Sequence, residues 1–179
     1  CLYRAVPVHV STDLDNLVTE LATVDPHYFL NVPMLLERIK NGVEGQIAKR
    51  PLPIRWLYRR GREGLQKGAQ AGRRDRLFRT LADRLIFTKV RERIGPSLAC
   101  LICGSAPLGE DTQQWFSTFG IPVYQVYGLT ETTAIVTMDQ PPEVTPGRVG
   151  PTIDGVKVRL MDGELQVKGK AIRIPTFEV

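Results

Sequence analysis

The spacing of hydrophobic and polar residues predicts alternating helices and strands along most of the chain. Apolar residues three and four positions apart predict helices over residues 13–24, 33–47, 75–94 and 111–119. Short apolar or β-branched runs predict strands over residues 2–10, 28–31, 98–103 and 123–127, the second of them buried. The strand, helix and strand between residues 98 and 127 are typical of a parallel βαβ unit. We therefore expect an α/β fold with a mostly parallel sheet and flanking helices.

Each predicted helix has one apolar face. Pro33 suits the first position of a helix, because its missing N–H has no helical partner there, and Gly95 followed by Pro96 should end the 75–94 helix. The core-facing residues predicted in chain order are Leu14, Leu17, Val18 and Leu21; Leu35, Leu36, Ile39, Val43 and Ile47; Leu77, Phe78, Leu81, Leu85, Val90 and Ile94; and Trp115, Phe116 and Phe119.

Two segments depart from this regular alternation. Residues 50–74 are rich in arginine and glycine, with Trp56, Leu57 and Leu65 as their strong apolar anchors, so we expect an irregular or helical excursion there. After Met138, prolines and glycines separate short alternating runs, which is typical of β-hairpins. We divide the chain into an α/β subdomain over residues 1–140, with a helical insert at about 50–95, and a β-rich segment over residues 141–179.

Composition limits the class of protein. The 179 residues are 42% hydrophobic, which is enough to bury a core. The apolar runs are far shorter than the roughly 18 residues that a membrane-spanning helix needs, and no basic-then-apolar leader stands at Cys1. We expect a cytoplasmic protein, or a piece of one that continues upstream of Cys1.

Few residues are available for metal or redox chemistry. Cys100 and Cys103 have the C-x-x-C spacing, but in a strand an offset of three sends side chains to opposite faces. His9 and His27 have no histidine or cysteine neighbour at ligand spacing. Buried packing and structural roles are therefore favoured over ligation or redox work.

Positive charge is concentrated in one region. The net charge is +5, but residues 50–93 hold 14 Lys and Arg against 4 Asp and Glu, so the rest of the chain is acidic. A solvated helical face is the simplest interpretation. Peripheral contact with the anionic inner face of a membrane is the second. Nucleic-acid binding is disfavoured, because aromatic residues are not interleaved with the basic ones.

Two unusual loops follow the predicted strands at 98–103 and 123–127. Ligands of open parallel sheets bind beyond the carboxyl ends of the strands, so both loops should open on one edge. Residues 104–109 are mostly small, which lets a flat ring approach the backbone. The second loop combines the ring of Tyr127 with the Thr130 hydroxyl and the Glu131 carboxylate, which suit a purine beside a magnesium-bound phosphate.

A structural interpretation of the second loop competes with this one. Glycine followed by threonine and glutamate is common where a strand turns into a helix, because Thr130 would cap the helix and Glu131 would sit favourably in its first turn. This loop alone does not establish nucleotide binding.

Four motifs together resemble the adenylate-forming superfamily of acyl-CoA synthetases, luciferases and nonribosomal peptide adenylation domains. Tyr127-Gly128-Leu129-Thr130-Glu131 matches the Y-G-x-T-E signature, and Gly104-Ser105-Ala106-Pro107-Leu108 is similar to the G-G-A-P-L adenine loop. Residues 146–158 resemble the P-G-x-V-G-x-P and G-V-x-V stretch, and residues 163–169 resemble G-E-(L/I)-x-V-(K/R)-G. Residues 25–39 and 81–93 are similar to the long-chain fatty acyl-CoA synthetases in particular.

The resemblance implies a two-step reaction with ATP, Mg²⁺ and coenzyme A (CoA). A long-chain fatty acid would attack the α-phosphate of ATP to form an acyl-adenylate, and CoA would then take the acyl group as a thioester. Tyr127 would stack on adenine, while Thr130 and Glu131 would serve catalysis by contacting a phosphate and holding Mg²⁺. The residues implied in ATP and AMP binding are Gly104, Ser105, Ala106, Pro107, Gln125, Val126, Tyr127, Gly128 and Thr130.

Several family features are missing or changed. The sequence has no Ser/Thr/Gly-rich phosphate loop, no ribose-binding aspartate after Gly169 and no C-terminal domain with a catalytic lysine, so we expect a central fragment that is inactive by itself. The alternatives are a short non-catalytic relative, an anion- or membrane-surface-binding module, and an adenylate-forming enzyme for another carboxylic acid. Val126 stands where relatives often have glycine and would narrow the acyl channel, and residues 170–179 depart from the family pattern.

Overall fold

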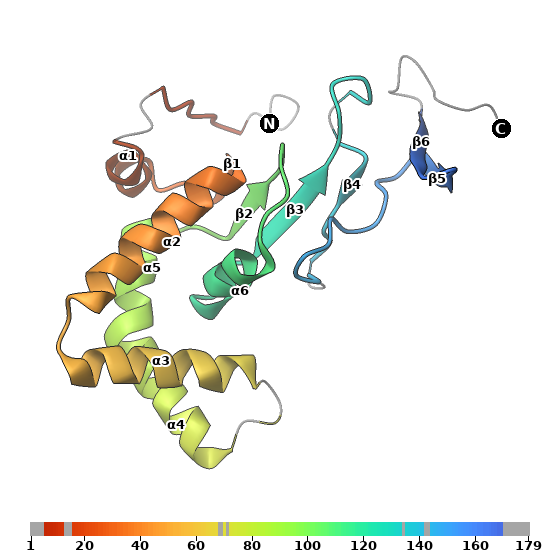
Figure 1. Ribbon diagram of the computed structural model, residues 1–179. Coiled ribbons are helices and arrows are strands. Elements are labelled where there is room, and N and C mark those ends of the chain that lie inside the picture. Colours follow the sequence, from red (N-terminus) through yellow and green to blue (C-terminus); the bar gives the residue numbers. More distant parts are fainter. Residues whose placement is uncertain are drawn as a thin grey trace.

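The predicted alternation of helices and strands is present in the computed structural model (Figure 1). The structure describes residues 6–12, 16–67, 70, 72–133, 135–141 and 144–169. The helices are α1 (Leu17–Val24), α2 (Pro33–Ala48), α3 (Leu52–Gln66), α4 (Arg73–Ala82), the π-helical turn η3 (Asp83–Phe87), α5 (Thr88–Ile94) and α6 (Glu110–Thr118). The strands are β1 (Tyr28–Asn31), β2 (Cys100–Cys103), β3 (Val123–Tyr127), β4 (Thr137–Met138), β5 (Val156–Met161) and β6 (Glu164–Gly169). The α/β fold class is confirmed.

The first three strands form the parallel part of a sheet in the order β1-β2-β3-β4. β2 pairs in parallel with both β1 and β3, and the short strand β4, which the sequence pattern did not predict, pairs antiparallel with β3. Helix α6 connects β2 to β3, so the predicted βαβ unit is present. Because β2 and β3 are parallel neighbours, the loops that follow them leave the sheet at the same edge.

Two strand predictions need correction. Residues 6–10 of the predicted 2–10 strand lie outside any strand, and residues 2–5 fall outside the described part of the chain. The 28–31 strand is present but not buried, since Tyr28 is 63% exposed and Leu30 is 70% exposed. Tyr28 and Leu30 are two residues apart, so they share one face of the strand, and that face is exposed.

The main core lies where α2, α3, η3, α5 and α6 meet the sheet. Trp115, Phe116 and Phe119, predicted to face the core from α6, are fully buried. The ring of Phe87 packs edge-on against Phe119, with 5.4 Å between centroids. Tyr58 was missed as an anchor of the 50–74 segment: it is buried, and its hydroxyl accepts a 2.9 Å hydrogen bond from Nε1 of Trp115.

The predicted faces of α1 and α2 largely hold. Leu17 and Leu21 of α1 are buried, whereas Leu14 lies outside the described residues and nothing is described of the Val18 side chain. In α2, Leu36 and Ile39 are buried, and the other three predicted residues, Leu35, Val43 and Ile47, pack partly buried against the same core.

The arginine-rich insert is helical, and α3 and α4 pack together as a pair that projects from the sheet (Figure 1). A Cβ added at Gly61 would overlap the Cβ of Ala82, so the two helices approach closely through this glycine. The predicted core face of α4 is partly wrong: Leu77, Leu81 and Leu85 are exposed. The face of α4 that packs is the one turned toward α3. After α4, the π turn η3 inserts one extra residue, which brings Ile86 and Phe87 into the core.

The β5–β6 hairpin confirms the predicted β-rich texture of the last segment. Asp162 and Gly163 join the strands with φ of 52° and 83°, the two left-handed residues of a tight hairpin turn. Val167 and Val136 form a second, small core against which Tyr127 and Val156 pack. The subdomain boundary near residue 140 stays a prediction. Among the described residues, none of the helices has both the length and the apolar composition that a membrane span requires.

Candidate functional site

The two predicted loops lie side by side at the carboxyl edge of the sheet. Cys103 at the end of β2 is in register with Gln125 in β3. The loop of residues 104–109 therefore starts beside the last residues of β3, and the loop of residues 128–133 follows directly on. The prediction that both loops open on the same edge is confirmed by the parallel pairing of their strands.

Gly104, at the start of the 104–109 loop, packs against Val126 of β3. A Cβ added at Gly104 would lie 2.6 Å from Cγ2 of Val126, a separation that real side chains do not show. Gly104 is the small residue that leaves room for the Val126 side chain. Whether the same side chain narrows an acyl channel stays a prediction.

The loop after β2 presents its small residues to solvent. Ser105, Ala106 and Pro107 are exposed, and Leu108 is buried beneath them. Ser105 has φ of 71°, the left-handed conformation that glycine adopts without strain. This backbone would suit the glycine of the G-G-A-P-L motif that the loop resembles, and Ser105 occupies the same position here.

Thr132 organises the loop after β3. Its hydroxyl accepts a 2.9 Å bond from the Leu129 N–H and donates a 2.9 Å bond to the Leu129 carbonyl oxygen. This closed turn leaves Thr130 and Glu131 exposed at its tip. The helix-capping interpretation is wrong for this loop, because the described residues from 128 to 141 contain no helix and lead into β4.

Tyr127 and Gly128 are half-buried where β3 ends. The Tyr127 side chain packs against the small core around Val136 and Val167, and its carbonyl oxygen accepts a 2.8 Å bond from the Val136 N–H. Tyr127 is thereby held between the sheet edge and the β-rich segment, next to the exposed turn that carries Thr130 and Glu131.

Gln125 has a different environment from its neighbours, because its side chain is buried. Its Oε1 accepts a 3.2 Å bond from the Leu108 N–H, and its Nε2 donates a 2.9 Å bond to Oε1 of Gln113. The Gln125 backbone N–H donates to Oδ2 of Asp139 at 2.8 Å. Sequence reasoning missed Thr132, Gln113 and Asp139; the one available signal was a glutamine on the otherwise aromatic face of the 111–119 helix.

The described residues lack a cluster of metal-ligating side chains. They contain no group of three or more His, Cys, Asp or Glu side chains close enough together to hold an ion. Glu131, exposed at the tip of its turn, fits the other kind of site, in which Mg²⁺ takes one protein carboxylate and completes its shell with phosphate oxygens and water. The charge of the nucleotide would then supply most of the attraction.

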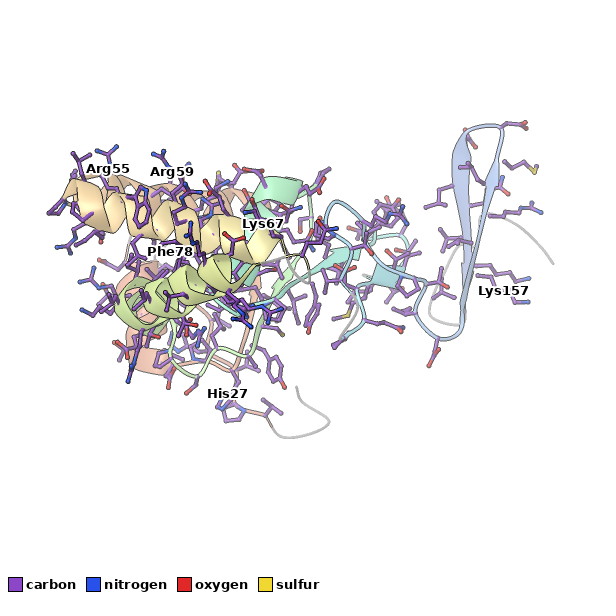
Figure 2. The ribbon with its side chains drawn as sticks, turned by 90° about the horizontal axis from the view of Figure 1, so that it is seen from below. His27, Arg55, Arg59, Lys67, Phe78 and Lys157 are labelled. Atoms are coloured by element: carbon purple, nitrogen blue, oxygen red, sulfur yellow. The ribbon has the colours of Figure 1, made fainter. Side chains whose placement is uncertain are left out.

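The predicted buried packing of the two cysteines is confirmed, whereas structural roles for the histidines stay a prediction. Cys100 and Cys103 are free thiols buried in β2, and burial raises the pKa of Cys103 to about 11, which disfavours the reactive thiolate. His27 is exposed on the surface (Figure 2), and His9 lies 3.9 Å from a carboxylate oxygen of Glu20.

A concave surface lies between α2 and α3, away from the two loops. It encloses about 400 Å³ and is lined by arginines and glutamates, including Arg55, Arg59, Arg62, Glu44 and Glu63. Nη1 of Arg62 donates a 2.9 Å bond to Glu44, so part of this charge is neutralised. Figure 2 shows Arg55 and Arg59 on α3, with Lys157 on the hairpin at the other end of the molecule.

The chain matches curated proteins over almost its whole length. It is 28% identical to "Long-chain-fatty-acid--CoA ligase FadD15" of Mycobacterium bovis over 95% of the chain and 29% of that protein. It is 26% identical to "Long chain acyl-CoA synthetase 3" of Arabidopsis thaliana over 96% of the chain and 28% of that protein. The chain thus spans less than a third of the length of these relatives, which are acid–thiol ligases.

Solved structures share the fold at low sequence identity. ATP-bound MatB from Rhodopseudomonas palustris superposes with a TM-score of 0.54 and 23% identity over 90% of this chain and 25% of that one. The model of the AMP-binding enzyme family matches residues 2–171. That match leaves only Cys1 and residues 172–179 uncovered, and this chain therefore belongs to the AMP-binding enzyme family.

Proposed function

We propose that this chain supplies the adenine- and magnesium-binding part of a long-chain fatty acid–CoA ligase. The observation that carries the proposal is the contact between Gly104 and Val126, which joins the adenine loop to the strand of the Y-G-x-T-E motif. Two loops that resemble nucleotide-binding motifs are thus part of one surface. The relatives that share most of the chain act on long-chain fatty acids by name, which supports this substrate class.

The reaction has two steps. A fatty carboxylate oxygen attacks the α-phosphorus of ATP, and the bond from that phosphorus to the pyrophosphate oxygen breaks, giving an acyl-adenylate and pyrophosphate. The CoA sulfur then attacks the acyl carbon and AMP leaves. Mg²⁺ would lower the repulsion between the phosphates and the incoming carboxylate. This chain's part is to hold adenine between Tyr127 and the 104–109 loop and to place Thr130 and Glu131 at the phosphates.

The experiment replaces Glu131 by glutamine, which keeps the shape and removes the charge. In the ligase that contains this chain, adenylation measured as pyrophosphate release should fall by at least about a hundredfold, the scale of removing a positioned electrostatic group. Glu164→Gln, at an exposed position of the hairpin, is the matched control and should leave the rate unchanged. Near-normal release by the Glu131→Gln variant at ordinary Mg²⁺ would refute the assigned role.

We further propose peripheral contact with an anionic membrane through the α3–α4 pair. The supporting observation is that three leucines, Leu77, Leu81 and Leu85, are exposed at four-residue spacing on α4 and η3. Exposed arginines accompany them on the same helices, among them Arg73, Arg74, Arg76 and Arg79. Apolar side chains flanked by arginines complement the hydrocarbon and headgroup layers of an anionic bilayer.

Liposome flotation tests this contact. Vesicles of neutral phospholipid with a third of anionic lipid should bind the chain, and binding should weaken steeply with salt, since each basic residue near the surface contributes about 1 kcal/mol. Leu81→Glu should abolish binding, whereas Leu160→Glu, at a 75% exposed leucine of the hairpin, should not. Equal binding to neutral vesicles, or no difference between the two variants, counts against the contact.

A further inference from the structure

A chain of buried polar groups runs beneath the two loops. Its side chains are Gln113 of α6, Gln125 of β3 and Asp139 just after β4, which are 0%, 4% and 3% exposed. Through them the structure connects the 104–109 loop, helix α6, two strands and the turn at Gly147. Polar groups this deeply buried stay in a core only when their hydrogen bonds are made, so the position of each segment depends on the others.

The donor and acceptor in each of these hydrogen bonds can be assigned from the backbone groups at either end of the network. The Val123 carbonyl can only accept, so the group 2.9 Å from it on Gln113 is the donor Nε2. Oε1 of Gln113 then accepts from the Gly147 N–H at 3.1 Å and from Nε2 of Gln125 at 2.9 Å.

Gln125 therefore has a single orientation. With Nε2 committed to Gln113, its Oε1 faces the Leu108 N–H at 3.2 Å. Asp139 closes the arrangement from the other side: Oδ2 accepts from the Gln125 N–H at 2.8 Å and from Nε2 of Gln113 at 3.4 Å, while the Asp139 N–H donates to the Gln125 carbonyl at 3.0 Å.

We propose that Gln113, Gln125 and Asp139 are positioning residues. They fix the 104–109 loop relative to β3 in the position in which it can receive adenine. This inference rests on the proposed function, because it assumes that the loop receives adenine. Gln125 acts by fixing Leu108, and its buried amide is not free to contact the nucleotide. The bond from the Gly147 N–H extends the same restraint to the Pro146-Gly147 turn. The β-rich segment and the 104–109 loop are therefore both held by hydrogen bonds to the same buried side chains.

Amide hydrogen exchange tests the restraint without nucleotide. In the unaltered chain, the Leu108 amide should exchange as slowly as amides within β3 and far more slowly than that of Ala106, two residues earlier in the same loop. Gln125→Met keeps the length of the side chain and removes both hydrogen bonds. Leu108 exchange should then quicken about tenfold or more, the scale of one buried bond. Gln140→Met, at an exposed neighbour of Asp139, should change nothing.

Nucleotide preference tests the consequence for the site. If the loop reads adenine, Gln125→Met should lower the preference for AMP over GMP by about tenfold, while the Mg²⁺ dependence of binding, which Glu131 carries, stays. A general loss of stability would weaken both nucleotides equally and would not change the ratio. The melting temperature of each variant is measured alongside.

The outcomes separate the restraint from the function. Fast exchange of Leu108 in the unaltered chain overturns the restraint, and this measurement decides even if Gln125→Met does not fold. Unchanged Leu108 exchange in a folded Gln125→Met variant overturns it as well. Slow exchange that Gln125→Met releases, in a ligase that contains this chain and binds neither AMP nor GMP, would leave the restraint standing and refute the proposed function.

Discussion

Gly104 is small because of the residue across from it. Its backbone conformation is one that other residues adopt, yet its missing Cβ leaves the space that Cγ2 of Val126 fills. A glycine in a phosphate- or ring-binding loop is usually explained by close approach of the ligand. Here the close approach of the neighbouring strand is a sufficient explanation. The effect of a substitution at position 104 should therefore depend on the residue at position 126.

A double-mutant cycle makes this coupling measurable. Gly104→Ala should destabilise the chain by about 1–3 kcal/mol, because the added methyl overpacks against Val126. Val126→Ala removes the obstructing group, so the double variant should lose less than the sum of the single losses, with a coupling of about 1 kcal/mol or more. Urea unfolding of the four proteins gives the cycle. Strict additivity would show that the two side chains do not meet.

Asp139 is a buried carboxyl group whose charged form is disfavoured by its surroundings. Burial raises its pKa above the usual 3.8, against the lowering effect of the bonds from the Gln125 N–H and from Gln113. The folded state therefore holds this proton more tightly than the unfolded state does. The contribution of Asp139 to stability is greatest below its ordinary pKa and is lost as the pH rises through the raised value.

Asparagine at this position should remove that loss. The Asn side-chain oxygen can accept the same two bonds, so Asp139→Asn should be more stable than the unaltered chain at pH 7, and the difference should vanish as the pH falls below about 4. Denaturant unfolding at a series of pH values measures it. Asp154→Asn, at an exposed aspartate, is the control. If Asp139→Asn is instead less stable than the unaltered chain at pH 7, the charge itself supports the bonds.

The α3–α4 pair depends on two glycines one turn apart in α3. A Cβ at Gly61 would meet Ala82 and the ring of Phe87, and a Cβ at Gly64 would lie 2.9 Å from the Asp75 carbonyl oxygen. Their spacing of three places both on one helix face. Beyond this contact, Trp56 packs edge-on against Phe78 with 5.0 Å between centroids, and Arg60 lies over the Trp56 ring.

Alanine substitutions in two helices separate this packing from helix propensity. Gly61→Ala should destabilise the chain by about 1–3 kcal/mol through overpacking. Gly45→Ala in α2, where nothing lies within 4 Å, should stabilise it by about 0.5–1 kcal/mol, since alanine favours a helix over glycine. Thermal unfolding followed by circular dichroism compares them. Equal effects at the two positions would contradict a close α3–α4 contact.

Helices and strands could be predicted from sequence where local residue spacing determines them. The buried face of a helix could not be predicted where packing against another helix determines it. Pro33 begins a helix and Gly95 follows the end of one, as the sequence indicated. The exposure of the α4 leucines could not be predicted, because it results from the packing of Ala82 against Gly61. Gly61 lies in another helix, about 20 residues earlier in the sequence. The same holds at the site: the motif loops were identified from sequence, but Gln113 and Asp139 act through neighbours that only the fold brings together.

The 179 residues carry motifs that resemble adenine-binding loops, but no Ser/Thr/Gly-rich stretch of the kind expected to hold a triphosphate. Of the four serines in the sequence, Ser97 bonds Asp25 and Ser117 bonds the Gln113 carbonyl, so both are committed elsewhere. Positioning and charge neutralisation at the phosphates provide most of the catalysis of such reactions.

By itself, therefore, this polypeptide should form no thioester from palmitate, ATP, Mg²⁺ and CoA. It should bind AMP or ATP no more tightly than the millimolar range, about 4 kcal/mol. Mass spectrometry of the reaction mixture and calorimetry with ATP test the two statements separately. Robust turnover would require phosphate ligands within this chain, and the arginines of residues 50–93 would be the first to mutate.

The π turn between α4 and α5 has a consequence for changes in chain length. Both the N–H and the hydroxyl of Thr88 donate to the Asp83 carbonyl oxygen, five residues earlier, so this turn holds one residue more than an α-helical turn. Deleting one residue here would allow α4 and α5 to fuse into a continuous helix. It would also rotate α4 by about 100° around its axis and carry Ala82 away from Gly61. A relative shorter by that residue would need a different pair of small residues to join its insert helices.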